Sequence, residues 1–111
     1  MMDGVESLPF GLKPEVIEKI RAVLAACPEV EQVIVYGSRA MDTYRKGSDI
    51  DITLLGENLA WEHLQRISSA LDDLLLPWKI DISLFKQIEN PELAAHIQRV
   101  GKVFYKKQAF D

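Results

Sequence analysis

The chain has 111 residues, of which 48% are apolar and 27% are charged, and its net charge is −4 at pH 7. This length suits a single domain, residues 1–111, and the negative charge argues against direct nucleic-acid binding through a basic face. The single cysteine, the lack of a membrane-length apolar stretch and an amino terminus unlike a secretory signal together predict a cytoplasmic protein with no membrane partner.

The first half of the chain predicts a helix followed by two strands. Residues 1–12 have no regular pattern, and apolar residues at helical spacing then predict a helix between residues 14 and 28, with a proline at each end. The β-branched run VEQVIVY, residues 30–36, predicts a buried strand. Residues 37–48 form a turn, a short helix and a loop, and the alternating run DIDITLL, residues 49–55, predicts a second strand.

The second half repeats the alternation of helix and strand. An amphipathic helix is predicted from Trp61 to Leu75, ahead of Pro77, and a strand over residues 78–85. A further helix starts at Asn90-Pro91 and ends at Gly101. The last run, KVFYKK, either adds a short strand or continues without regular structure. The order predicts an α/β (α+β) fold in which helices flank one small mixed sheet.

Three aspartates lie within otherwise apolar strands. Alternation puts Asp49 and Asp51 on the same face of their strand, with Cα atoms roughly 6.6 Å apart. Two adjacent carboxylates repel each other, and Mg²⁺ relieves this repulsion because it prefers oxygen ligands. Asp81 lies between two isoleucines and joins the pair if its strand is a neighbour. Three carboxylates can hold two metal ions roughly 3.5–4 Å apart, and Asp81 would also be placed as a base toward a hydroxyl.

The dipeptide Gly37-Ser38 directly follows the first predicted strand. Glycine allows close approach of the backbone to a ligand, and serine opens a turn or short helix whose N–H groups and hydroxyl can hold phosphate oxygens. The sequence contains no GxxxxGK[ST] P-loop. The adjacent Arg39 is the best-placed cation for neutralising triphosphate charge. We therefore predict that Gly37, Ser38 and Arg39 bind the nucleotide beside the metal-binding aspartates.

The spacing of these residues resembles a known signature. Gly37-Ser38, ten intervening residues and then Asp49-x-Asp51 match the GSx10DxD pattern of polymerase-β-type nucleotidyltransferases, and the later strand with Asp81 resembles the minimal nucleotidyltransferase (MNT) branch. The resemblance covers roughly residues 14 to 105. It implies that Ser38 contacts phosphate and that Asp49, Asp51 and Asp81 hold Mg²⁺, two ions in all.

The same resemblance implies a reaction and a partner. An acceptor hydroxyl would attack the α-phosphate of a nucleoside triphosphate, with ATP as the expected substrate, and pyrophosphate would leave. Proteins that resemble this one are commonly antitoxins paired with HEPN-domain ribonucleases, and they can add AMP to a tyrosine of the HEPN toxin. Whether the chain also forms a homo-oligomer is left open by the sequence.

Each motif also has a plain structural interpretation. The aspartates can be surface acids of amphipathic strands, and Gly37-Ser38 can be ordinary turn chemistry. Lys79 shares strand parity with Asp81, so it lies either on the active face or simply at the surface. We expect these further residues to have structural or surface roles: Ser48 as a loop cap, Cys27 packed at a helix end, His63 and His96 at the surface, and Trp61 and Trp78 as core or interface anchors.

Three functions compete on this evidence. The first is an active nucleotidyltransferase that modifies a partner protein. The second is an antitoxin without enzymatic activity that neutralises a HEPN ribonuclease by forming a complex. The third is an enzyme acting on a small acceptor, which the short chain disfavours because no acceptor-binding domain is visible in the sequence. Substitution of Asp49 and Asp51 by asparagine separates the first from the second.

Overall fold

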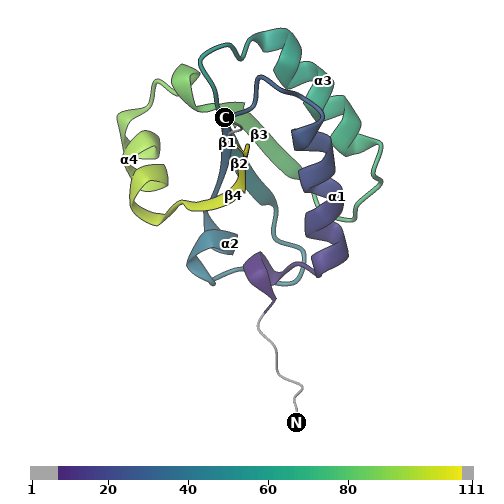
Figure 1. The fold of residues 1–111 in the computed structure, drawn as a ribbon. Coiled ribbons are helices and arrows are strands. Elements are labelled where there is room, and N and C mark those ends of the chain that lie inside the picture. The colour runs from purple at the N-terminus through teal and green to yellow at the C-terminus, as the bar shows by residue number, and fades with distance from the viewer. Residues whose placement is uncertain (1–7, 109–111) are drawn as a thin grey trace.

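The structure, a computed structural model, describes residues 8–108 and is organised around one four-stranded sheet (Figure 1). The strands are ordered β3-β2-β1-β4 across the sheet. The elements in chain order are η1 (Pro9–Gly11), α1 (Pro14–Ala25), β1 (Gln32–Tyr36), α2 (Ser38–Met41), β2 (Ile50–Leu55), α3 (Trp61–Asp72), β3 (Ile80–Leu84), η2 (Phe85–Gln87), α4 (Pro91–Val100) and β4 (Lys102–Lys106).

The sheet is mixed, as predicted. Strand β1 pairs antiparallel with β2 on one side and with β4 on the other, while β2 pairs parallel with β3. The parallel pair needs a long crossover, and α3 supplies it. The run KVFYKK therefore contributes a strand, which the sequence left undecided.

Helices cover the two faces of the sheet unequally. Figure 1 shows α1 and α3 together on one side and α4 on the other. The side chains of Ile20, Leu24 and Ile67 from these two helices are buried against the sheet, as the helical spacing of apolar residues requires. Isoleucines 50 and 52 of β2 are fully buried on this side. The opposite face is left more open, and it is the face that carries the aspartates.

Several predicted boundaries differ from the structure by up to three residues; the strands expected over residues 30–36 and 78–85 span Gln32–Tyr36 and Ile80–Leu84. The helix expected to reach Leu75 ends at Asp72, because Leu75 adopts a left-handed conformation with φ of 55° and its N–H bonds to the carbonyl of Asp72. This tight turn sends the chain back toward β3. The irregular stretch 1–12 contains the short 3-10 helix η1, and residues 1–7 lie outside the described part of the chain. No helix within residues 8–108 is long and apolar enough to span a lipid bilayer.

Candidate active site

The three predicted aspartates come from two neighbouring strands. Asp51 lies in β2 and Asp81 in β3, and the parallel register pairs these two residues directly. Paired residues of adjacent strands, roughly 4.8 Å apart, have side chains on the same face. Asp49 lies just before β2, two residues from Asp51, and is exposed. The sequence predicted that Asp81 joins Asp49 and Asp51 if its strand is their neighbour, and the pairing of β3 with β2 confirms that condition.

Burial and the neighbouring carboxylates together disturb the ionisation of Asp51. Burial raises the pKa of the Asp51 carboxyl above its ordinary value, and the negative charges of Asp81 and Asp49 raise it further. The positive charges of His96 and Lys79 act in the opposite direction. These are the four charged groups that act on the Asp51 carboxyl.

The acidic cluster makes no salt bridge within residues 8–108. Among residues 8–108, no Lys or Arg nitrogen lies within salt-bridge distance of Asp49, Asp51 or Asp81. The same part of the chain contains no group of three His, Cys, Asp or Glu side chains that could hold a metal ion. Carboxylate oxygens are nevertheless the ligand type of Mg²⁺, which is usually bound by one or two carboxylates together with substrate phosphates and water.

Gly37 lies against this cluster at the end of β1. Tyr36, its neighbour, pairs with Asp51 across the antiparallel ladder. Gly37 has φ of 73° and ψ of −153°, a conformation that is essentially restricted to glycine. A Cβ atom at this position would lie 2.6 Å from Oδ2 of Asp51. The glycine thus allows the Asp51 carboxylate to approach the backbone just where Ser38 begins α2.

Arg39 lies in a different environment from the one its position beside Ser38 suggests. Only 2% of its surface is exposed. Its Nε and Nη2 donate to the carbonyl of Ser48 at 3.1 and 2.9 Å, and Nη1 donates to the carbonyl of Phe10 at 2.8 Å. The guanidinium also packs over the rings of Tyr44 and Trp78. This burial favours a structural role over the triphosphate contact expected from the sequence, because the donors already have protein acceptors.

The loop before Asp49 is fixed from both sides. The carbonyl of Ser48 accepts the Arg39 bonds, while its hydroxyl accepts the N–H of Arg45 at 2.8 Å. The predicted capping role of Ser48 is confirmed. Arg45 and Lys46 are exposed on this loop. Arg39 therefore acts on the site through the backbone next to Asp49.

Two residues of the site were not predicted from the sequence. The ring of His96, on α4, meets the ring of Tyr36 edge-on with centroids 6.3 Å apart, and His96 is half-buried and not a free surface side chain. The pKa of Tyr36 is raised by burial and by the charges of Asp51 and Asp81, and a hydrogen bond with Ser83 opposes that rise. The position of Tyr36 at the end of a predicted strand, directly before Gly37-Ser38, could have indicated its place in the site. No local pattern indicated that α4 would bring His96 to the same place.

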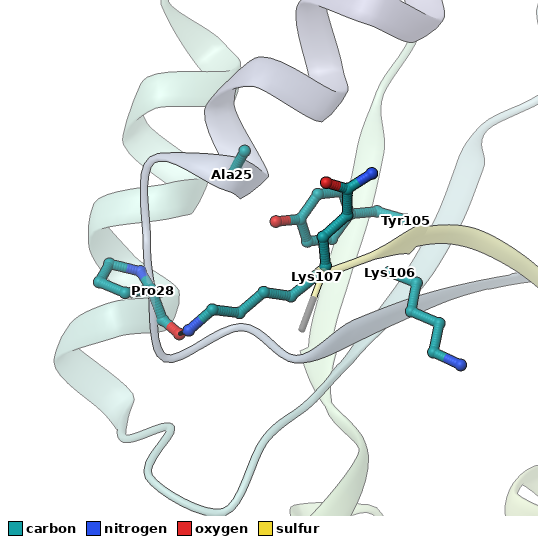
Figure 2. A pocket seen from close by; sticks show the side chains of 6 residues that line it. Ala25, Pro28, Tyr105, Lys106 and Lys107 are labelled. Atoms are coloured by element: carbon teal, nitrogen blue, oxygen red, sulfur yellow. Dashed lines mark hydrogen bonds between the residues drawn. The ribbon is translucent and has the colours of Figure 1, made fainter. Parts of the chain in front are cut away.

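One of the pockets in the structure lies away from the aspartates. Figure 2 shows this pocket of about 480 Å³, lined by Ala25, Pro28, Tyr105, Lys106, Lys107 and Gln108. Nζ of Lys107 crosses it and donates to the carbonyl of Pro28 at 2.9 Å. The pocket lies beside β4, at the opposite edge of the sheet from Asp81, so it plays no part in the candidate chemistry.

Comparison with protein families decides the relationship that the geometry suggests. The family described as "Polymerase beta, Nucleotidyltransferase" matches residues 18–110. The chain belongs to this nucleotidyltransferase family. Its mixed four-stranded sheet with flanking helices is accordingly the polymerase-β nucleotidyltransferase fold. A comparison with curated proteins returned no match.

Several solved structures similar to this nucleotidyltransferase-family chain come from toxin–antitoxin complexes. A crystal structure of a toxin–antitoxin with AMP-PNP is 26% identical, with a TM-score of 0.61, over 83% of this chain and 74% of that chain. The toxin–antitoxin MntA–HepT is 22% identical, with a TM-score of 0.57, over 86% and 74%. The complex of the tri-AMPylated Shewanella oneidensis HEPN toxin with MNT antitoxin is 21% identical, with a TM-score of 0.50, over 84% and 68%. At these identities the last two establish a shared fold.

Proposed function

We propose that this chain is a Mg²⁺-dependent nucleotidyltransferase that transfers AMP from ATP to a tyrosine hydroxyl of a cognate HEPN toxin and so acts as its antitoxin. The observation that carries the proposal is the juxtaposition of Asp51 and Asp81 on adjacent strands, with Asp49 two residues from Asp51 and no salt bridge to any of the three among residues 8–108. Two related complexes support the substrate and the partner, one with AMP-PNP and one with an AMPylated HEPN toxin.

The proposed chemistry assigns a task to each residue of the cluster. Asp49, Asp51 and Asp81 hold Mg²⁺, two ions in all, and Gly37 and Ser38 position the triphosphate. When bound, Mg²⁺ neutralises the carboxylates and the charge that develops on the phosphate oxygens. The acceptor oxygen forms a bond to the α-phosphorus, the bond from that phosphorus to the bridging oxygen breaks, and pyrophosphate leaves. Asp81, the more exposed of the two paired acids, accepts the proton of the hydroxyl.

Intact-mass measurement of the partner tests this proposal. The purified HEPN protein is incubated with this chain, ATP and Mg²⁺, alongside a matched Asp49→Asn/Asp51→Asn variant. One or more AMP masses should be added in the first reaction and none in the second. A tight complex without any mass gain would reject the transferase and leave neutralisation by binding alone. Transfer to a small hydroxyl compound without the partner would instead indicate a small-acceptor enzyme.

A further inference from the structure

The outer edge of β3 has unpaired backbone groups next to the acidic cluster. Strand β3 lies at the end of the sheet, and no other strand within residues 8–108 pairs with its outer side. The N–H of Ile50 donates to the carbonyl of Lys79 at 2.9 Å, which fixes the phase of the parallel ladder. In such a ladder alternate residues direct both backbone groups to the same neighbour. Asp81 therefore bonds inward to β2, while Ile80 and Ile82 direct their N–H and C=O groups outward.

The two sheet edges differ in how they are protected. Edge strands commonly carry lysines or bulges that discourage pairing with another chain. Strand β4 has both, because Lys102 and Lys106 are exposed and its register with β1 shifts between Val33 and Ile34. Strand β3 keeps an unbroken register with β2 over all five residues, and its own side chains include no lysine. Of the two edges, β3 is the one suited to accept a further strand.

A groove lined by both apolar and polar side chains runs beside this edge on the helical side of the sheet. It has a volume of about 450 Å³, and its lining includes Trp61, Leu64 and Ser68 of α3, together with Ile82. The sequence predicted that Trp61 packs in the core or at an interface. The side chain is 58% exposed, which favours the interface. Asp72 also lines the groove, so it is acidic as well as apolar. An occupant would therefore combine apolar side chains with basic ones.

We infer that the outer edge of β3 docks an extended segment of the partner protein, which adds a fifth strand and places its acceptor hydroxyl beside Asp81. The inference rests on the proposed function and names where its acceptor binds. A residue paired with Asp81 would have its side chain on the same face, one strand spacing or roughly 4.8 Å away. Its two neighbours would point to the opposite face, toward the groove of Trp61 and Ile82. The segment is thus a hydroxyl residue between two apolar residues, with basic residues nearby.

This mode of binding differs from contact with an apolar patch alone. Main-chain hydrogen bonds supply much of the affinity, and the alternating side chains supply the specificity. The acidic groups on both faces of β3, Asp81 on one and Asp72 on the other, favour a basic segment and disfavour a nucleic acid. The occupant is therefore a polypeptide, and the free edge determines that it is extended.

Amide hydrogen exchange of the intact protein, measured by NMR with and without the purified HEPN protein, tests the inference directly. In the free chain the outward amides of Ile80 and Ile82 should exchange fast, while the inward amide of Asp81 is protected. Binding should slow the outward amides by about tenfold or more. A complex that leaves both amides unprotected would overturn the inference. Protection already present in the free chain and dependent on its concentration would also overturn it, because a second copy would then occupy the edge.

A proline substitution at an outward amide provides the matched test of function. Ile82→Pro removes an N–H that β2 does not use, whereas Ile82→Val keeps it. We expect the Kd for the HEPN protein to rise roughly tenfold in the first variant and to stay unchanged in the second. Circular dichroism establishes that each is folded, and the exchange experiment on the unmodified chain decides the matter if the proline variant is not. If folded Ile82→Pro binds the HEPN protein with the wild-type Kd and still transfers AMP, the docking site alone is refuted. If the unmodified chain transfers no AMP, the proposed function is refuted.

Discussion

Replacement of Arg39 by alanine separates two interpretations of the residue after Gly37-Ser38. Its guanidinium makes three hydrogen bonds to two backbone carbonyls, those of Ser48 and Phe10, and alanine would leave both acceptors without these donors. A buried polar group left unsatisfied costs about 1–3 kcal/mol, so two of them cost about 2–6 kcal/mol. Burial lowers the pKa of Arg39, opposed by Tyr44 and Asp49, yet an arginine remains charged throughout the usual pH range.

The loss is large relative to the stability of a chain of this size. The free energy of unfolding of a small domain is about 5–15 kcal/mol. A loss of 1 kcal/mol lowers Tm by about 4–8 °C, so Arg39→Ala should lower Tm by at least about 8 °C. Thermal unfolding followed by circular dichroism measures the effect. Arg39→Lys is the matched control, because it keeps the charge but cannot reach both carbonyls, and it should lower Tm almost as much. An unchanged Tm with a raised KM for ATP would refute this reasoning and restore the triphosphate contact.

Three further predictions concern the aspartate cluster. Gly37→Ala should cost about 2 kcal/mol in a denaturant titration, because φ of 73° strains an alanine, and it should abolish AMP transfer by displacing the Asp51 carboxylate; an active variant would contradict the close approach. Asp51→Asn should raise Tm at pH 7 in the absence of metal. The reason is that the pKa of Asp51 is higher in the folded than in the unfolded protein, so the wild type loses stability as the pH rises through this pKa. The difference in Tm between variant and wild type should vanish at acid pH, where Asp51 is protonated in both the folded and the unfolded protein. Mg²⁺ with ATP should raise the Tm of the wild type and chelation should reverse the shift, whereas an equal rise in Asp51→Asn would place the metal elsewhere.

The sequence predicted the elements of this fold because each has its own local pattern. Alternation marked β2 and β3, helical spacing marked α1, α3 and α4, and prolines marked several boundaries. The same alternation put Asp49 and Asp51 on one face. Adding Asp81 required the two strands to be neighbours, which was a conditional prediction that the parallel register confirmed.

Features that depend on packing between distant segments could not be predicted from the sequence. The expected triphosphate contact of Arg39 followed from its sequence neighbour Ser38, but its environment is set by Phe10 and by Trp78, which belong to other parts of the chain. His96 reaches the site only because α4 packs over β1. Periodicity describes which face of an element is apolar, and it carries no information about which polar side chains of two elements will meet.

The charge balance of Asp51 bears on the choice between catalysis and binding alone. A half-buried carboxylate beside two others, with no Lys or Arg partner among residues 8–108, makes the folded protein less stable above its raised pKa. An asparagine at this position would remove the repulsion and keep the strand. A protein that only covered its partner would gain nothing from this unfavourable charge. In a nucleotidyltransferase the same carboxylates become favourable once Mg²⁺ is bound, because the metal ion neutralises both their negative charge and that of the triphosphate. The raised pKa of the Asp51 carboxyl is therefore consistent with the proposal that the site binds metal and nucleotide.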